Sequence, residues 1–227
     1  MSSAASTREY APGRSLDLYG DPAAPVVLLW HGMQTDSRTA VRPLAERIAG
    51  HGFSVVAPDW DSHAADNGRS DLLASARFAS EQPGAVDGLV VVGWSLGGAA
   101  AAGLAFGAAD YRVRVAHTVC LAGAFMAANP LTGEPLTPGR APGGQATMTL
   151  VHGSADDVIP VSVGRDFAVE AGGAGWLVQY IELAADHANI VGARHDAAAD
   201  RYEPADDPAS LAVAAEVASV VARSAPR

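Results

Sequence analysis

The sequence contains no lysine: all 15 basic residues among its 227 are arginines. A phosphate-binding loop of the Walker type requires a lysine, and pyridoxal phosphate is held as a Schiff base on a lysine, so both kinds of site are excluded. The formal net charge is −10, and the arginines are scattered singly along the chain. Because nucleic acids and anionic membranes are bound through clustered basic residues, we expect neither as a partner.

Cysteine and long apolar runs are scarce as well. The single cysteine, Cys120, excludes an internal disulfide and fits a reducing compartment, and the apolar residues around it indicate a core position. The first ten residues lack the apolar block of a secretory signal, and charges or glycines interrupt every later apolar run before it reaches membrane-spanning length. We therefore expect a cytoplasmic protein, and its oligomeric state stays open.

Length and apolar content predict a single domain over residues 1–227. Hydrophobic residues make up 49% of the chain, enough for a large core, and no shift in composition marks a boundary. Residues 1–14 are expected to form a flexible N-terminus, followed by an edge strand over 15–19. Apolar residues at helical spacing predict a helix that is capped at its start by a residue within 35–37 and is ended by Gly50 and Gly52.

One stretch, Val90–Gly98, combines a strand, a tight turn and the start of a helix. Three valines lead into the pentapeptide Gly-Trp-Ser-Leu-Gly, and alanines follow. Such a turn forces Ser95 into a strained backbone conformation and requires Gly93 and Gly97, because larger side chains would collide with the neighbouring strand or helix. The hydroxyl is then held above the sheet, near the free N–H groups of the following helix. This geometry suits a nucleophile.

Three other predicted strands lead into chemically distinctive loops. An apolar strand near the N-terminus ends in His31-Gly32. A later strand is followed by the adjacent carboxylates Asp156 and Asp157, then by an apolar pair and a proline that opens the next helix. The loop after the last predicted strand contains His187.

In this order the motifs resemble the α/β-hydrolase superfamily and, within it, small carboxylesterases that lack a cap, over roughly residues 22–222. The resemblance implies an α/β-hydrolase fold, with a mostly parallel central sheet, helices on both faces and no large cap domain. Many members carry a helical cap where this chain has the segment 129–139. That segment is turn-rich and too short for a cap.

The resemblance assigns Ser95 as the nucleophile, Asp156 as the acid and His187 as the base of a catalytic triad. Their order along the chain is the one expected for this fold and differs from the orders in chymotrypsin and subtilisin. Asp157 stays open as an alternative acid, because spacing alone does not separate adjacent carboxylates. His195 stays open as an alternative base.

The resemblance also implies an oxyanion hole. In the hydrolases that the sequence resembles, a His-Gly pair precedes the residue whose backbone N–H completes the hole. Here that residue is Met33, and the amide of Leu96 is the second expected donor. Two fixed amides aimed at a developing alkoxide contribute several kcal/mol of transition-state stabilisation. A triad with this oxyanion hole requires no cofactor and no metal.

Four side chains are expected to contact the substrate: Trp94, Gln34, Phe125 and Met126. Leu131 is a fifth candidate, and plain local packing is the alternative reading of Phe125, Met126 and Leu131. Without a cap, the pocket that they line would be open and shallow.

A carboxylate-rich loop over residues 59–68 invites a metal hypothesis. Its alternating acids slightly resemble a calcium loop, but Ala64 stands where the sharp turn requires glycine, and no terminal glutamate follows. We instead predict a solvated loop at the rim of the active site, from which His63 or Trp60 touches the substrate.

These inferences predict a serine hydrolase that cleaves small to medium carboxylic esters through an acyl-enzyme, with a small-molecule ester as its partner. A thioesterase, a lactone hydrolase and an acyltransferase would use the same residues, so they stay open as alternatives. A ligand-binding scaffold with an idle triad is the non-enzymatic alternative. Halide-releasing and epoxide-opening members of the superfamily carry aspartate in place of Ser95 and are disfavoured.

Overall fold

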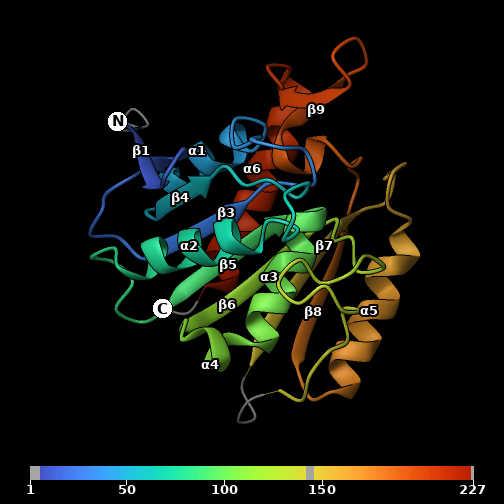
Figure 1. Ribbon diagram of the computed structural model, residues 1–227. Helices are drawn as coiled ribbons and strands as arrows, with labels where there is room; N and C mark the ends of the chain where they lie inside the picture. Colours follow the sequence, from blue (N-terminus) through green and yellow to red (C-terminus); the bar gives the residue numbers. More distant parts are fainter. Residues whose placement is uncertain (1–5, 142–145, 226–227) are drawn as a thin grey trace.

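The computed structural model describes residues 6–141 and 146–225. An eight-stranded sheet lies between helices, and its strand order is β1-β2-β4-β3-β5-β6-β7-β8 (Figure 1). The strands are β1 (Ser6–Ala11), β2 (Arg14–Tyr19), β3 (Val26–Trp30), β4 (Ser54–Pro58), β5 (Leu89–Trp94), β6 (Val115–Leu121), β7 (Thr147–Gly153), β8 (Leu177–Leu183), β9 (Ala193–Asp196) and β10 (Arg201–Pro204). The helices are α1 (Arg42–Gly50), α2 (Arg69–Ser80), α3 (Leu96–Phe106), α4 (Ala108–Tyr111), α5 (Val161–Gly173), the 3-10 helix η2 (Asn189–Val191) and α6 (Pro208–Ser224).

The sheet is parallel from β4 through β8, and only β1 and β2 join it antiparallel. Strand β3 shows why its sequence is continuously apolar. All five of its residues are buried: Val26, Leu28 and Trp30 belong to one hydrophobic cluster, and Val27 and Leu29 belong to the other. A strand covered on both faces needs apolar side chains at every position.

Helices cover both faces of the sheet. On one face, α1 packs against α6, with Leu44 and Val217 among their buried residues. On the other face, α2, α3 and α5 contribute Leu72, Leu104 and Phe167 to the cluster that contains Trp30 of β3. The segment between β6 and β7 contains no helix in its described residues. The predicted architecture, a mostly parallel sheet between helices without a large cap, is therefore confirmed.

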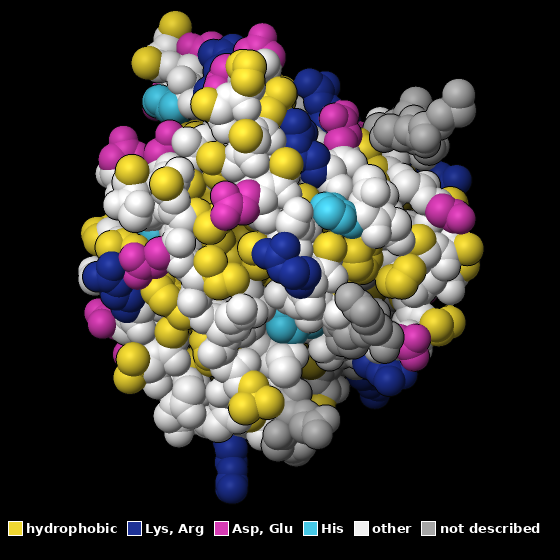
Figure 2. Space-filling view, turned by 180° about the vertical axis from the view of Figure 1, so that it is seen from behind, with side chains coloured by type: hydrophobic (Ala, Val, Ile, Leu, Met, Phe, Trp, Pro, Cys, Tyr) yellow, Lys and Arg dark blue, Asp and Glu magenta, His cyan; other side chains and the backbone are white. Residues whose placement is uncertain are grey.

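Seen from behind, arginine side chains lie singly among acidic ones and do not gather into a basic patch on that face (Figure 2). No helix in residues 6–141 and 146–225 is long and apolar enough to cross a membrane.

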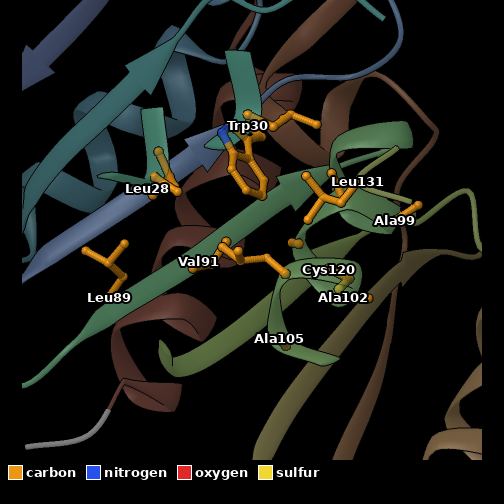
Figure 3. Close-up of a cluster of buried hydrophobic side chains, with 14 of the residues drawn as sticks. Leu28, Trp30, Leu89, Val91, Ala99, Ala102, Ala105, Cys120 and Leu131 are labelled. Atoms are coloured by element: carbon orange, nitrogen blue, oxygen red, sulfur yellow. The ribbon is translucent and has the colours of Figure 1, made fainter. Parts of the chain in front are cut away.

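Helix α3 lies close to the sheet because its inner side chains are small. Ala99, Ala102 and Ala105 belong to the same buried cluster as Val91 of β5 (Figure 3). Cys120 is a free, buried cysteine in the same cluster, as predicted, and burial raises the pKa of its thiol.

The N-terminal part of the chain differs from the sequence prediction. Residues 6–11 form strand β1, whereas residues 1–14 were expected to be flexible, and residues 1–5 lie outside the described residues. The predicted edge strand, β2, lies inside the sheet because β1 pairs with its free side. Strand β1 has four exposed residues and no apolar alternation, so it carries no pattern that predicts a strand.

The predicted start of the first helix is wrong. Helix α1 begins after Val41, with a proline in its first turn and no side-chain cap. The N–H of Ser37 donates to His31 Nε2, and the N–H of Arg38 donates to Asp59 Oδ1, so these residues belong to loop contacts made by distant parts of the chain.

Candidate active site

Ser95 occupies the sharp turn between β5 and α3. Its backbone angles are φ 57° and ψ −120°, a strained conformation for a residue with a side chain. A Cβ on Gly93 would lie 2.0 Å from the Gly97 carbonyl oxygen, and one on Gly97 would lie 2.3 Å from the His31 carbonyl oxygen. Only glycine fits at both positions, as predicted. The Ser95 hydroxyl makes no hydrogen bond with the described residues.

Asp156 and His187 meet beside this turn. His187 Nδ1 lies 2.9 Å from Asp156 Oδ2. Because a carboxylate accepts, Nδ1 carries the proton, and Nε2 is left free to accept another. The ring is buried, and its backbone is anchored by the Trp94 indole N–H, which donates to the His187 carbonyl oxygen at 2.8 Å.

The carboxylate of Asp156 is fully buried and surrounded by donors. The N–H groups of Val158 and Ile159 donate to Oδ1 at 2.9 and 2.8 Å. His152 Nε2 lies 3.4 Å from Oδ2 and donates to the Ile159 carbonyl oxygen at 3.0 Å. Burial by itself raises the pKa of Asp156, but the hydrogen bonds from His152, His187 and the Ile159 amide outweigh it and hold the pKa below its usual range. Asp156 is therefore ionised.

The two alternatives from the sequence are placed differently. Asp157 is exposed, and its carboxylate makes no hydrogen bond with His187. His195 is exposed too, and its Nε2 lies 3.3 Å from Asp200 rather than near Asp156. Of the candidate pairs, the structure brings together Asp156 and His187.

The loop after β3 passes directly beside Ser95. A Cβ on Gly32 would lie 3.2 Å from the Ser95 Cβ. His31 holds this loop from inside: its Nδ1–H donates to the Gly32 carbonyl oxygen at 2.8 Å, and its Nε2 accepts the N–H groups of Ser37 and Trp60 at 3.3 and 3.2 Å. Burial lowers the pKa of His31 to about 3, so the ring stays neutral and can accept.

Two backbone N–H groups next to Ser95 are free of protein acceptors. The amides of Met33, in this loop, and Leu96, at the start of α3, donate to no acceptor within residues 6–141 and 146–225. Unpaired amides beside a nucleophile are available for a ligand oxygen.

A pocket of about 450 Å³ opens at Ser95. It is lined by Gly32, Met33, Gln34, Thr35, His63, Trp94, Ser95, Val158, His187, His195, Asp200 and Tyr202. Two expected substrate contacts, Trp94 and Gln34, are among them. His63 lines the pocket as well, whereas Trp60 is fully buried and donates through its indole N–H to the His31 carbonyl oxygen.

The other expected substrate contacts do not line this pocket. Phe125 and Met126 line a separate depression of about 200 Å³ over α5. The Phe125 ring stacks on Phe167 with centroids 3.8 Å apart, which holds it toward α5. Leu131 is 1% exposed and packs in the core. Phe125 and Leu131 thus make the local packing contacts that the alternative reading describes.

Three lining residues come from the hairpin of β9 and β10, a segment in which the sequence analysis named only His195, as an alternative base. His195, Asp200 and Tyr202 belong to it, and the hairpin projects from the rest of the molecule (Figure 1). Its strands are four residues each and mostly polar. No apolar periodicity could have predicted them.

The carboxylates of the 59–68 loop bind protein groups. Asp61 accepts from the Thr35 hydroxyl and the His63 N–H, and Asp66 accepts from Ser70. Among the described residues, no three His, Cys, Asp or Glu side chains are arranged to hold a metal ion.

Comparison with known proteins adds the family. The model of the alpha/beta hydrolase family matches residues 26–224. Esterase 2 of Thermogutta terrifontis phosphorylated by paraoxon has a TM-score of 0.68 and 19% identity, covering 98% of this chain and 96% of that chain. Its butyrate-bound form has a TM-score of 0.66 and 18% identity, with coverage of 98% and 96%.

A fungal enzyme is similar to the same extent. Carboxyl esterase 2 from the mycorrhizal fungus Tuber melanosporum has a TM-score of 0.69 and 14% identity, covering 98% of this chain and 86% of that chain. A search of curated protein sequences finds no match. At these identities, the similarity to solved structures shows a shared fold and no more. The family model matches residues 26–224, which is most of the sequence, and therefore shows the family. The chain belongs to the alpha/beta hydrolase family.

Proposed function

We propose that this protein is a serine hydrolase that cleaves small to medium carboxylic esters, with Ser95, Asp156 and His187 as its catalytic triad. The observation that carries the proposal is the 2.9 Å contact between His187 Nδ1 and the buried Asp156 carboxylate, in a pocket that also exposes Ser95. In the neutral ring, this contact places the proton on Nδ1, so Nε2 is the nitrogen that accepts the proton of Ser95.

In the first half of the reaction, Ser95 Oγ attacks the ester carbonyl carbon while its proton passes to His187 Nε2. Asp156 stabilises the imidazolium, and the N–H groups of Met33 and Leu96 bind the oxyanion of the tetrahedral intermediate. The intermediate collapses to acyl-Ser95, and the departing alkoxide takes the proton from His187 and leaves as the alcohol.

In the second half, water attacks the acyl-enzyme carbonyl and gives a proton to His187. The second tetrahedral intermediate uses the same two amides. Its collapse releases the carboxylic acid and returns the proton to Ser95 Oγ, so that the free enzyme is restored.

The size of the pocket and the similar structures support small substrates. A volume of about 450 Å³ is in the range of pockets that bind small molecules. The similar esterase of Thermogutta terrifontis has been crystallised with butyrate and with propionate.

The test compares hydrolysis of p-nitrophenyl butyrate and p-nitrophenyl decanoate by the wild type and by Ser95→Ala. We expect the wild type to prefer the butyrate ester and Ser95→Ala to lose activity by at least about 10³-fold. Ser80→Ala is the matched control, because Ser80 donates to the Ala76 carbonyl oxygen within α2, away from the pocket. Retention of activity by Ser95→Ala would contradict the proposal.

The same assay distinguishes the transferase alternative. If p-nitrophenol is released substantially only after an alcohol is added, and the alcohol is acylated, the protein is an acyltransferase on the same triad. If the wild type consumes no ester or thioester with or without added alcohol, the protein is a ligand-binding scaffold with an idle triad and not an esterase.

A further inference from the structure

Gln34, the residue after Met33, is bound through both ends of its side-chain amide. Its Oε1 accepts the backbone N–H of Tyr202 at 2.6 Å. Its Nε2 donates to the Ser37 hydroxyl at 2.9 Å and lies 3.3 Å from the Tyr202 carbonyl oxygen. The amide thus contacts the N–H and the C=O of one strand residue, which is how a neighbouring strand would pair with it. It therefore has few free groups for a substrate.

The residue that Gln34 binds lies in the β9–β10 hairpin, 168 positions further along the chain. The pairs of this hairpin are Tyr202 with His195 and Glu203 with Arg194, among others, and no further strand of the described residues joins it. Because isolated two-stranded hairpins are marginally stable, this one needs contacts with the body of the protein. Gln34 provides one such contact at the outer edge of β10.

The Tyr202 ring provides another such contact. It packs edge-on against Trp94, with centroids 5.0 Å apart, and lies 6.0 Å from the His187 ring. The hairpin thus rests on the residue that anchors His187, while its backbone is bound to the loop that carries Met33. It touches both parts of the proposed machinery, the base and the oxyanion loop.

We propose that Gln34 is a positioning residue, which fastens the loop 31–37 to the β9–β10 hairpin so that the Met33 N–H is held toward the oxyanion and the hairpin forms a fixed wall of the pocket. This rests on the proposed function, because the oxyanion is the one formed by the ester. Gln34 acts through Met33 and Tyr202 and does not itself touch the reacting atoms.

Other side chains also hold the loop 31–37 in place, so the hydrogen bonds of Gln34 act in addition to theirs. His31 holds it from the core side, and the Ser62 hydroxyl donates to the Met33 carbonyl oxygen at 2.5 Å. Loss of the Gln34 amide therefore leaves the fold intact and loosens one side of the loop. An amide donor misplaced by a fraction of an ångström weakens transition-state binding and leaves substrate binding nearly unchanged.

The experiment is Gln34→Met, which keeps the length of the side chain and removes its hydrogen bonds. For p-nitrophenyl butyrate we expect kcat to fall by about 10-fold and KM to change by less than about twofold. The affinity for a trifluoromethyl ketone, which forms a tetrahedral adduct with the serine, should fall by a similar factor. Hydrogen exchange should become faster in peptides that cover residues 193–204 and 31–37.

Gln82→Met is the matched control. Gln82 also donates through its side-chain amide to a carbonyl oxygen, that of Phe78, but lies outside the pocket. We expect Gln82→Met to have the same kcat, the same affinity for the trifluoromethyl ketone and the same hydrogen-exchange rates in the hairpin as the wild type. This control separates loss of the clamp from the general effect of replacing a glutamine by methionine.

Two results would overturn the inference: an unchanged kcat in Gln34→Met, or a lower kcat with unchanged exchange in the hairpin. If the wild type hydrolyses no ester, the proposed function fails by itself, and hydrogen exchange still decides whether Gln34 fastens the hairpin. Equal exchange in Gln34→Met and wild type would then reject the clamp.

Discussion

The carboxylate of Asp156 combines full burial with ionisation. A buried charge is costly unless it is paired and hydrogen-bonded, and here two backbone amides and two histidine rings supply the donors. His152 lies beside this carboxylate, and its buried ring donates to the Ile159 carbonyl oxygen.

A second buried histidine predicts how stability depends on pH. His117 lies between the hydroxyls of Thr147 and Thr149, at 2.7 and 2.9 Å, and burial lowers its pKa to about 4 from the ordinary 6.5. Below pH 6.5 the unfolded chain binds a proton at this ring and the folded chain does not. The free energy of unfolding is therefore highest above pH 6.5 and falls as the pH drops toward 4, by up to about 1.4 kcal/mol per pH unit.

The variant His117→Gln should lose that part of the pH dependence. Urea unfolding between pH 7 and pH 4 measures it, and we expect the slope to be smaller than in the wild type by up to one proton. His31 is still present in the variant and keeps its own contribution to the pH dependence of the free energy of unfolding, because burial lowers its pKa to about 3. His51→Gln, at an exposed histidine, controls for the replacement of a histidine by glutamine. Identical slopes in His117→Gln and wild type would reject the assignment.

At the scale of elements, the turn at Ser95 depends on how closely α3 approaches β3. A methyl group on Gly97 would collide with the His31 carbonyl oxygen at 2.3 Å and the Trp30 carbonyl oxygen at 2.7 Å. Since both are backbone atoms, α3 or the loop after β3 must move. We expect Gly97→Ala to lower esterase activity by at least about 100-fold and the free energy of unfolding by about 2 kcal/mol or more.

Gly172 provides the opposite case with the same substitution. It lies in α5, is exposed, and a Cβ there would meet nothing within 4 Å. Gly172→Ala should raise the free energy of unfolding by about 0.5 kcal/mol and leave activity unchanged, because alanine favours the helix. Urea unfolding and ester hydrolysis measure both variants. Equal effects of the two substitutions would show that close packing at Gly97 does not matter.

The elements that could be predicted from the sequence are those with local signals. Strands β3 and β5 are continuous apolar runs, and the turn at Ser95 needs its two glycines for steric reasons within a few residues. The hairpin of β9 and β10 has no such signal, because its polar strands are held by Gln34 and Trp94 from distant parts of the chain. The predicted start of α1 was wrong for the same reason. The N–H groups of Ser37 and Arg38 bind His31 and Asp59, which lie elsewhere in the chain.

At the scale of the molecule, the parallel sheet gathers the candidate site. Strands β3, β5, β7 and β8 run in one direction, so the loops that follow them lie along one edge. Ser95, Asp156 and His187 could be predicted from the sequence because each follows such a strand in the order of the family. The substrate contacts could be predicted only in part. Phe125 was expected in the pocket, but its direction depends on stacking against Phe167 in α5.

Charge is the remaining property of the whole molecule that bears on the substrate. The net charge is −10, and Asp200 lines the Ser95 pocket, while Asp157 and Asp186 line the adjoining one. Tyr202 lines both pockets. Burial is the main cause that raises the pKa of its hydroxyl, and these carboxylates raise it further. Arg194 lines the adjoining pocket, but no arginine is among the described residues that line the Ser95 pocket. Asp200 is therefore the carboxylate among the described residues that line the Ser95 pocket, and no cationic arginine there offsets it.

We accordingly expect esters with a cationic alcohol group to react faster than anionic esters of the same length. The ratio of their kcat/KM values should be several-fold at low salt and approach the intrinsic ratio at about 0.5 M salt, because screening removes steering. Asp200→Asn should lower the low-salt ratio, and Asp110→Asn, an exposed aspartate outside the pocket, should not. A ratio that does not depend on salt would mean that substrate choice is set by contacts within the pocket and not by the field of the molecule.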